Sequence, residues 1–450
     1  MPVEQEGTAA HGAFFEVLRN APFLRLWGAQ AISMTAQSMV NFAVIVFTER
    51  LTQSSFFTSL AVLSFTLPAV AVGTFAGVVV DRSNKARVLL ISNVLRMVLM
   101  IGFFFAESEA PAALRLAVIF TLTAAFSIVS QFFGPAEAAT IPLVVPRRHL
   151  LAANALFATT YNASLVLGLA VIGPLLVSLL GLGRLWLFVA ILYAVSALLV
   201  ARLPAGEAKL VEQAVGTGPW TRFRQLYWEP VRESWQFMIR QPAIRTATIN
   251  LSLAATILLV VSTLGPGFVS RTLGRNPEDL SLVVLPASLG MLTGIILVGR
   301  VVIRVGSRRL IGFSMAGAGT LLILMATTQS WSGAIGQLVM GDQFDATMQG
   351  TLAIAGAMVA AYGLGIAHSF VTVPANTELQ AETSEEMRGR VFASLFMIIG
   401  FLSMLPVLFA GALADIIGLI TVMVLVALLM IFTGAMTLRR GVHKDPTSAP

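Results

Sequence analysis

The chain has 450 residues, of which 57% are hydrophobic and only 11% are charged, and it carries a net charge of +7. Soluble globular domains have about 25% charged residues, and a soluble fold of this length has too little interior to bury so many apolar side chains. The basic residues are scattered between apolar runs, which argues against a nucleic-acid partner, and the lack of cysteine excludes disulfides and thiolate metal sites.

Charge-free apolar runs follow one another along the chain, and most reach the roughly 20 residues that a membrane-spanning helix needs. With one further run that is interrupted only by Arg96, they predict twelve transmembrane helices. The predicted spans are 26–48, 51–80, 88–106, 116–136, 150–183, 185–201, 246–270, 280–299, 310–341, 346–377, 391–414 and 416–438. A β-barrel would instead alternate polar and apolar residues over segments of about ten residues, which these runs do not. We therefore predict an all-α membrane protein.

The longest polar segment, 203–245, separates six predicted spans from six. It predicts an N-terminal half (1–202) and a C-terminal half (246–450) joined by a cytoplasmic linker. Within the linker, TRFRQLYWEPVRESWQFMIRQP mixes aromatic and basic residues, which predicts an amphipathic helix on the membrane surface.

The two halves share a short repeat, because the Pro-Ala pair at 135–136, at the inner end of the fourth span, recurs at 374–375, at the inner end of the tenth. The second half also holds an extra polar stretch, SWSGAIGQLVMGDQFDATMQG, which predicts an outer loop before the tenth span. Two related six-helix halves, predicted to be pseudo-symmetric, are typical of transporters whose binding site lies between the halves.

Basic residues indicate the orientation of the chain. If the N-terminus is cytoplasmic, most of the 29 Lys and Arg residues lie on the cytoplasmic side. The bases left on the outer side are Arg50, Arg115, Arg184, Arg271 and Arg275. The positive-inside rule then predicts an integral protein of the cytoplasmic (inner) membrane with both termini in the cytoplasm.

The turn after the second span, GVVVDRSNKAR, concentrates charge in a few residues. Its candidate functional residues are Gly77, Asp81, Arg82, Lys85 and Arg87. Bases here anchor the cytoplasmic side, but an acid at the end of a span has a desolvation cost unless a cation or a helix N-terminus faces it. Two interpretations follow: a basic anchor, or a latch in which Asp81 meets the start of another helix. Gly77 would then allow close approach of a neighbouring helix.

Polar residues inside the predicted spans are the candidates for a substrate cavity. They are Gln37, Asn41, Gln131, Tyr161, Asn162, Asn250 and His368. Hydrogen bonds between helices, typically worth about 0.6 kcal/mol each, are an equal alternative for each residue. His368 could change charge near physiological pH or remain a neutral, hydrogen-bonded histidine. Arg96 lies inside the third predicted span. It could bind an anionic substrate or interact with another residue in a structural role, and we favour the structural role.

The charged turn resembles the loop 2–3 signature of the major facilitator superfamily, G-x-x-x-D-R-x-x-R-R, with the last base one place late. GPAEAATIPLVVPRRHLLAANAL and SEEMRGRVFASL resemble segments of its drug, macrolide and siderophore exporter branch. Many proton antiporters of that superfamily carry G-x-x-x-G-P in the fifth helix, and here Gly168, Gly173 and Pro174 have one residue too many. Their fourth-helix R-x-x-x-G pattern is absent, because Arg115 lies at the outer end of its span.

The resemblance implies a role for the charged turn as a cytoplasmic latch that closes the inner side of the outward-open state. Asp81 would face the N-terminus of the eleventh helix, near Arg388. Arg82 or Lys85 would pair with Glu137, the acid at the inner end of the fourth helix. In the second half, Arg304 or its neighbours would pair with the acids at 385–386 in a weaker latch.

These features together predict a monomeric secondary active transporter that works by alternating access. A mostly apolar and aromatic cavity favours export of hydrophobic or amphipathic small molecules, of a drug, macrolide or siderophore kind, driven by protons. The alternatives are a lysophospholipid translocator and a metabolite importer. We expect no enzymatic activity, catalytic residue, cofactor or metal site, because no Gly-rich nucleotide loop or metal-binding cluster appears and His residues number only 4.

Overall fold

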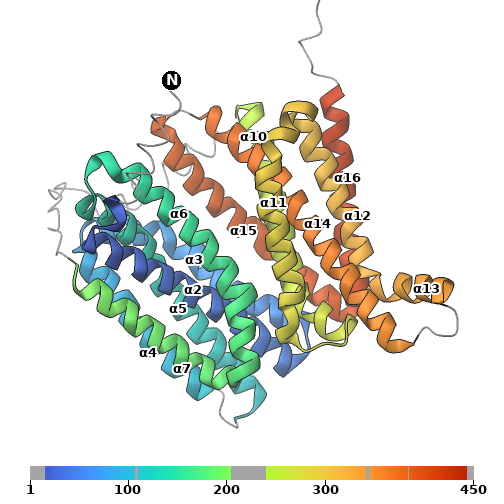
Figure 1. The fold of residues 1–450 in the computed structure, drawn as a ribbon, viewed down its shortest axis with the longest axis horizontal. Helices are drawn as coiled ribbons and strands as arrows, with labels where there is room; N and C mark the ends of the chain where they lie inside the picture. The colour runs from blue at the N-terminus through green and yellow to red at the C-terminus, as the bar shows by residue number, and fades with distance from the viewer. Residues whose placement is uncertain (1–15, 107–109, 204–239, 341–344, 384, 443–450) are drawn as a thin grey trace, which may run out of the picture. The chain divides into compact units, whose positions relative to one another are not determined.

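A computed structural model of the protein describes residues 16–106, 110–203, 240–340, 345–383 and 385–442. Every regular element in these ranges is a helix (Figure 1). The prediction of an all-α membrane protein is therefore confirmed. The amphipathic helix predicted in the linker falls mostly in 204–239, outside the described residues.

The described residues contain 11 helical segments that are long and apolar enough to cross a membrane. One of them, Arg147–Ala201, has 55 residues, whereas a span needs about 20. Its helix is broken at Gly181, whose φ of 76° and ψ of 166° are not helical. Two crossings within this segment would give the predicted total of twelve, which stays a prediction.

The chain forms two compact units. The first comprises residues 1–47 and 61–216, and the second comprises 48–60 and 217–450. The helices that lie wholly or largely in the first unit are α2 (Ala21–Thr52), α3 (Ser55–Asp81), α4 (Lys85–Ala106), α5 (Ala112–Val144), η1 (Arg147–His149), α6 (Leu150–Val166), η2 (Leu167–Ile172) and α7 (Gly173–Ala201). Within this unit α4 packs along both α5 and α7.

The second unit contains the remaining helices. They are α10 (Pro242–Gly267), η4 (Phe268–Thr272), η5 (Pro277–Leu280), α11 (Ser281–Val305), α12 (Ser307–Ala326), α13 (Thr328–Met340), α14 (Ala346–Ala381), α15 (Glu385–Ile417) and α16 (Leu419–Val442). The most extensive pairings are α11 with α14 and α12 with α16. At the first of these, a Cβ on Gly365 would overlap the Ala287 carbonyl and lie 2.7 Å from Met291 N. Small residues let the two backbones approach closely, as is common in membrane helix pairs.

The segment predicted as an outer loop before the tenth span is partly helical. The predicted ninth span, 310–341, breaks at Thr327 (φ −100°, ψ 15°), where α12 ends. The chain then forms the separate helix α13, which packs against α14. A charge-free run gives the length of an apolar segment but does not reveal a turn inside it. The sequence-based prediction therefore treated two helices as one span.

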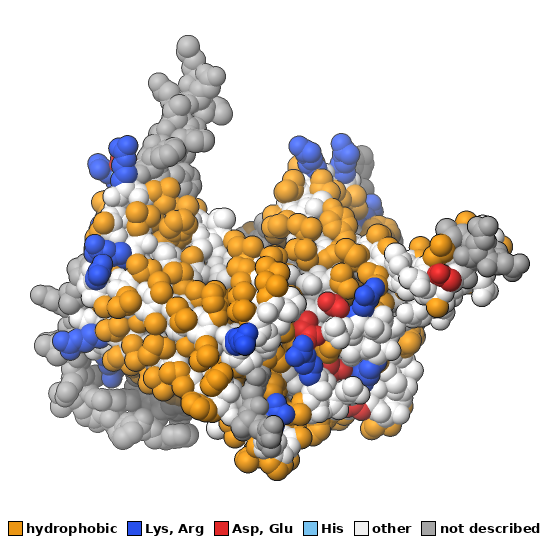
Figure 2. All heavy atoms as spheres, turned by 60° about the horizontal axis from the view of Figure 1, so that its bottom comes forward, with side chains coloured by type: hydrophobic (Ala, Val, Ile, Leu, Met, Phe, Trp, Pro, Cys, Tyr) orange, Lys and Arg blue, Asp and Glu red, His pale blue; other side chains and the backbone are white. Residues whose placement is uncertain are grey.

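Large apolar side chains lie exposed on both units. Hydrophobic side chains cover broad stretches of the surface in Figure 2. Examples more than half exposed are Leu151, Leu179, Ile296 and Phe432. Extended apolar surfaces are uncommon on soluble monomers and are expected where helices face lipid.

Candidate transport site and gate residues

An apolar cavity lies inside the second unit, between α10, α11, α12, α14 and α16. Its volume is about 100 Å³. Small side chains leave the space, among them Ala254, Ala287, Ala318 and Gly365, and the walls are otherwise aliphatic or Met. His368, on α14, is the one titratable side chain among the described residues that line it. A mostly apolar cavity with one polar group is the usual composition of a small-molecule pocket.

His368 is half-buried and lines this cavity. Its ring has no hydrogen bond or ion pair to any residue that the structure describes, whereas the backbone carbonyl of His368 accepts from the Thr372 hydroxyl at 2.9 Å. A neutral imidazole offers one donor and one acceptor. Liquid water occupies about 30 Å³ per molecule, so the cavity has room for a few waters or for part of a larger solute.

The first unit holds a fully buried arginine. Arg96, on α4, is 0% exposed, and its guanidinium carbon lies 4.9 Å from the ring centre of Phe133, 5.6 Å from Tyr193 and 6.0 Å from Phe126. Its Nη2 donates to the Ser130 carbonyl at 3.1 Å. Aromatic faces attract a cation, more strongly when it is desolvated. This buried position among aromatic rings is the one expected if Arg96 has the structural role favoured above.

Glu137 is a buried acid that acts electrostatically on Arg96 but forms no ion pair or hydrogen bond with it among the described residues. It lies on α5 one turn after Phe133, its residue is 7% exposed, and it interacts electrostatically with Arg96. Its Oε1 and the Nε and Nη1 atoms of Arg96 have no hydrogen-bond partner among the described residues. Buried polar atoms without partners are costly, so this region of the first unit carries a free-energy cost that the aromatic rings around Arg96 offset only in part.

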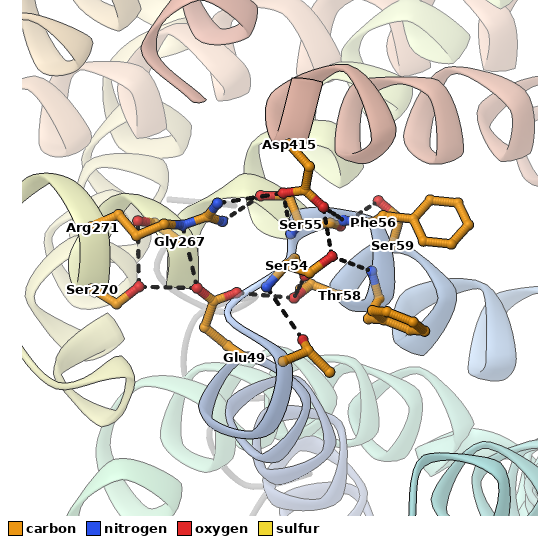
Figure 3. A network of polar contacts seen from close by, with 12 residues as sticks. Glu49, Ser54, Ser55, Phe56, Thr58, Ser59, Gly267, Ser270, Arg271 and Asp415 are labelled. Carbon is orange, nitrogen blue, oxygen red and sulfur yellow. Dashed lines mark hydrogen bonds and ion pairs between the residues drawn. The ribbon is translucent and has the colours of Figure 1, made fainter. Parts of the chain in front are cut away.

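A third set of polar residues lies at the tip of the α2–α3 hairpin, which packs in the second unit (Figure 3). Asp415, near the end of α15, accepts hydrogen bonds at the first turn of α3. The donors are the Ser54 hydroxyl at 2.5 Å, the Ser55 amide at 2.9 Å and the Phe56 amide at 3.0 Å. An acid stabilises the free amides and positive end of a helix N-terminus.

Arg271 joins Asp415 to a second acid in the same network (Figure 3). Its guanidinium lies 3.4 Å from Asp415 and 3.5 Å from Glu49, and it also donates to the Ser55 hydroxyl. Glu49 is 1% exposed and accepts from Ser270 at 3.0 Å. Sequence analysis did not group these residues, because each appeared only as a charge at the end of a different span.

Comparison with known proteins identifies the family. The model of the Major Facilitator Superfamily matches residues 26–405. The chain belongs to the Major Facilitator Superfamily. The sequence resemblance is therefore confirmed at the level of the superfamily.

Relatives within the superfamily are distant. The MFS-type transporter YfiS of Bacillus subtilis (strain 168) is 24% identical over 381 residues, which cover 84% of this chain and 83% of YfiS. Macrolide efflux protein A of Streptococcus pyogenes is 27% identical over 133 residues, covering 28% of this chain and 31% of that protein. A solved structure of the nucleoside transporter NupG is 14% identical, with a TM-score of 0.63, and the match covers 94% of this chain and 100% of that chain. That likeness shows the fold.

The charged turn of this superfamily member is a tight connection between α3 and α4. The Lys85 ammonium donates to the carbonyls of Asp81 at 2.9 Å and Ser83 at 3.0 Å, so it caps the end of α3. Asn84 accepts from the Arg87 amide at 3.1 Å and caps the start of α4. The side chains of Asp81 and Arg87 are exposed. Lys85 and Asn84 therefore serve to connect the two helices.

The predicted latch contacts have a mixed outcome. Glu137 forms no ion pair with Arg82, Lys85 or Arg96 among the described residues, although it interacts electrostatically with Arg96. A Cβ on Gly77 would meet nothing within 4 Å, so this glycine is not a close-packing position in this structure. Arg304, at the end of α11, is exposed. Arg388 is in the first turns of α15, and its side chain is not among those that the structure describes. The latch itself stays a prediction.

The glycine motif of the fifth predicted span is built around an extra residue. The segment η2 is a π-turn, and the Gly173 amide donates to the Gly168 carbonyl five residues earlier. A Cβ on Gly168 would lie 2.5 Å from the Thr35 carbonyl, and one on Gly173 would lie 3.1 Å from the Phe42 ring. Both glycines therefore face α2. A π-turn accommodates one added residue within a helix, which keeps the two glycines on one face despite their longer spacing.

The predicted cavity residues are not gathered at one place. Of them, only His368 lines the cavity of the second unit. Gln37 and Asn41 are half-buried on α2, and Asn250 is buried on α10. Gln131 and Asn162 donate to carbonyls of their own helices, at Ser127 and Ala158, and Tyr161 is 52% exposed. His368 lines an apolar cavity, and the role of all these residues in a substrate cavity stays a prediction.

Proposed function

We propose that this superfamily member exports hydrophobic or amphipathic small molecules across the cytoplasmic membrane, as a monomer with both termini in the cytoplasm. The observation that carries the proposal is the apolar cavity lined by His368, whose ring has no partner among the described residues. At about 100 Å³ the cavity takes only part of a bulky solute, to which it gives apolar contact area and one polar group for orientation, and it offers little to a highly charged metabolite. The partial likeness to macrolide efflux protein A supports export of compounds of that kind.

Proton influx would drive export. Two titratable groups support this part of the proposal, one in each unit: the buried Glu137 beside Arg96, and His368. The π-turn supports it too, because it restores the packing face of Gly168 and Gly173, and the pattern that these glycines resemble is found in many proton antiporters. Uptake of a proton by Glu137 would leave Arg96 without its counter-charge and so would favour rearrangement of the first unit.

Accumulation assays in a pump-deficient bacterium test the proposal. Cells expressing the wild-type protein should accumulate less of a lipophilic cationic dye and less of a macrolide than cells carrying an empty vector. A protonophore should abolish the difference, as should His368→Leu, which replaces the polar ring with an apolar side chain of similar size. His149→Leu is the matched control, because His149 lies outside the cavity and pairs with Glu16 at 2.8 Å.

Each outcome has a distinct meaning. Export that continues in the presence of the protonophore would exclude proton drive but leave the exporter intact. Equal accumulation of both compounds with and without the protein would contradict export of this class, and lysophospholipid transfer between leaflets would be assayed next. Retained export by His368→Leu would show that the cavity in the second unit is not the substrate site.

A further inference from the structure

The short helix α13, Thr328–Met340, lies in the stretch that the sequence predicted as an outer loop. With 13 residues it is too short to cross a membrane. It follows α12, whose 20 residues, at about 1.5 Å per residue, match a hydrocarbon core of about 30 Å. The turn at Thr327 therefore lies at a membrane surface. From this turn α13 runs across the direction of α12 and α16, along that surface (Figure 1).

The first half of α13 is held against its neighbours in the second unit. The Trp331 ring rests on Gly356 of α14, where a Cβ would overlap it. The indole N–H of Trp331 donates to the Leu324 carbonyl at 2.9 Å, near the end of α12. The Gln349 amide of α14 donates to the Gln329 carbonyl at 3.1 Å. These contacts fix the direction in which α13 leaves the turn.

The second half of α13 presents exposed apolar side chains. Ile335 and Leu338 follow Trp331 at spacings of four and seven residues, so the three side chains lie on one face of the helix. Leu338 is 87% exposed, and Val339 beside it is exposed too. Gln337 projects from the opposite face. Because α13 carries no charged residue, its apolar face is suited to hydrocarbon and has no base with which to bind an anionic surface.

A groove of about 490 Å³ lies between this half of α13 and the first turns of α14. Its walls are formed on α13 by Ile335, Gly336 and Val339, and on α14 by Met348, Leu352 and Ala355 among others. None of the described residues that line it is charged. A methylene group occupies about as much space as a water molecule, about 30 Å³, so the groove has room for roughly a dozen or more methylenes, the scale of one acyl chain.

We infer that the α13–α14 groove binds an acyl chain of a membrane phospholipid, with α13 lying in the membrane interface. The groove is continuous with apolar surface that faces lipid, because Val359, one turn after Ala355 on the same side of α14, is 70% exposed. The uncharged walls recognise the chain and not the headgroup. The site is distinct from the cavity lined by His368, and the inference does not depend on the proposed substrate.

Fluorescence quenching tests the site, since the natural chain has no cysteine. Thr351→Cys places a thiol-reactive fluorophore at the groove, which Thr351 lines, and Gln337→Cys places one on the opposite face of α13. Each full-length protein is reconstituted in phosphatidylcholine vesicles whose lipid carries bromine on one acyl chain. Bromine quenches on contact, so quenching at position 351 should be at least threefold stronger than at position 337.

Filling the groove separates a bound chain from general contact with the bilayer. Ala355→Phe adds a ring to the groove and should reduce quenching at position 351 at least twofold. Ala334→Phe is the matched control, because Ala334 is exposed on α13 but does not line the groove, and it should leave quenching unchanged. Elution of each purified variant as one sharp peak confirms folding.

Three outcomes would contradict the acyl-chain site. Equal quenching at positions 351 and 337 would overturn it, as would unchanged quenching in folded Ala355→Phe. Quenching that requires an anionic phospholipid and weakens in high salt would show that the headgroup is recognised instead. Weak quenching at position 351, together with disulfide cross-linking of Val339→Cys between two chains, would show that a second copy of the protein covers the groove. None of these measurements requires transport, so failure of the inference is distinguishable from failure of the proposed export.

Discussion

Replacing Glu137 with glutamine should destabilise the first unit by about 2 kcal/mol, because it removes the acid that acts electrostatically on the buried Arg96 guanidinium without being in contact with it. Arg96 is 0% exposed, and its remaining stabilisation comes from one carbonyl and three aromatic rings. A cation–π contact contributes about 0.5–2 kcal/mol, which is too little to replace the carboxylate in full. Arg96→Met removes the cation and keeps an extended apolar side chain.

A double-mutant cycle measures the coupling between the two groups. The variant with both changes should be more stable than Glu137→Gln alone by about 2 kcal/mol, since an apolar replacement of a whole buried pair is often tolerated. Unfolding in mixed micelles with increasing denaturing detergent is followed by tryptophan fluorescence. Trp186 is a suitable reporter, because it is buried and stacks on Phe103 with ring centres 4.6 Å apart.

An exposed arginine provides the control for this cycle. Arg87→Met combined with Glu137→Gln should be additive within about 0.5 kcal/mol, as expected for residues that do not interact. Additive behaviour of Arg96→Met and Glu137→Gln to within the same margin would refute the reasoning. In that case the aromatic rings alone would hold the buried arginine, and Glu137 would be free for another partner.

Four further outcomes are expected. Gly365→Ala should cost about 1–3 kcal/mol in a detergent unfolding titration because it forces α11 from α14, whereas Gly317→Ala should be neutral or slightly stabilising. His368→Leu should change the affinity for a fluorescent amphipathic dye at least severalfold while leaving expression unchanged; equal binding would remove His368 from the site. Asp81→Asn should insert and fold but transport poorly, so full transport would argue against the cytoplasmic latch and loss of the protein would favour an anchor. Deleting Ala170 should convert the π-turn to regular α-helix and leave unfolding of the purified protein nearly unchanged, and a large loss of stability would show that the π-turn itself is required.

Hydropathy predicted the membrane helices well because the property that identifies them is local. The charge-free run 26–48 lies within α2, for example, and the run 416–438 nearly coincides with α16. Breaks inside a run were not predictable by this means, as the turn at Thr327 shows, since a change of direction does not require a charged residue.

The candidate site was only partly predictable from the sequence. His368 was found because it is a rare titratable residue inside a span. The network of Glu49, Arg271 and Asp415 was missed because these residues are far apart in the chain and no local pattern links them. Glu137 was expected at the inner end of its span as the partner of Arg82 or Lys85, whereas it is buried within α5 and interacts electrostatically with Arg96 from the middle of α4, which only the packing of α4 on α5 reveals.

The π-turn at Leu167–Ile172 also bears on how such proteins are classified. Signature patterns count residues, whereas two helices in contact respond to the angle at which each side chain projects. A pattern with fixed spacing would assign this chain to the transporters that lack the glycine motif, although both glycines meet α2. Searches for this motif should therefore allow one inserted residue between the glycines, and chains recovered in that way should be compared by the helix face that the glycines occupy.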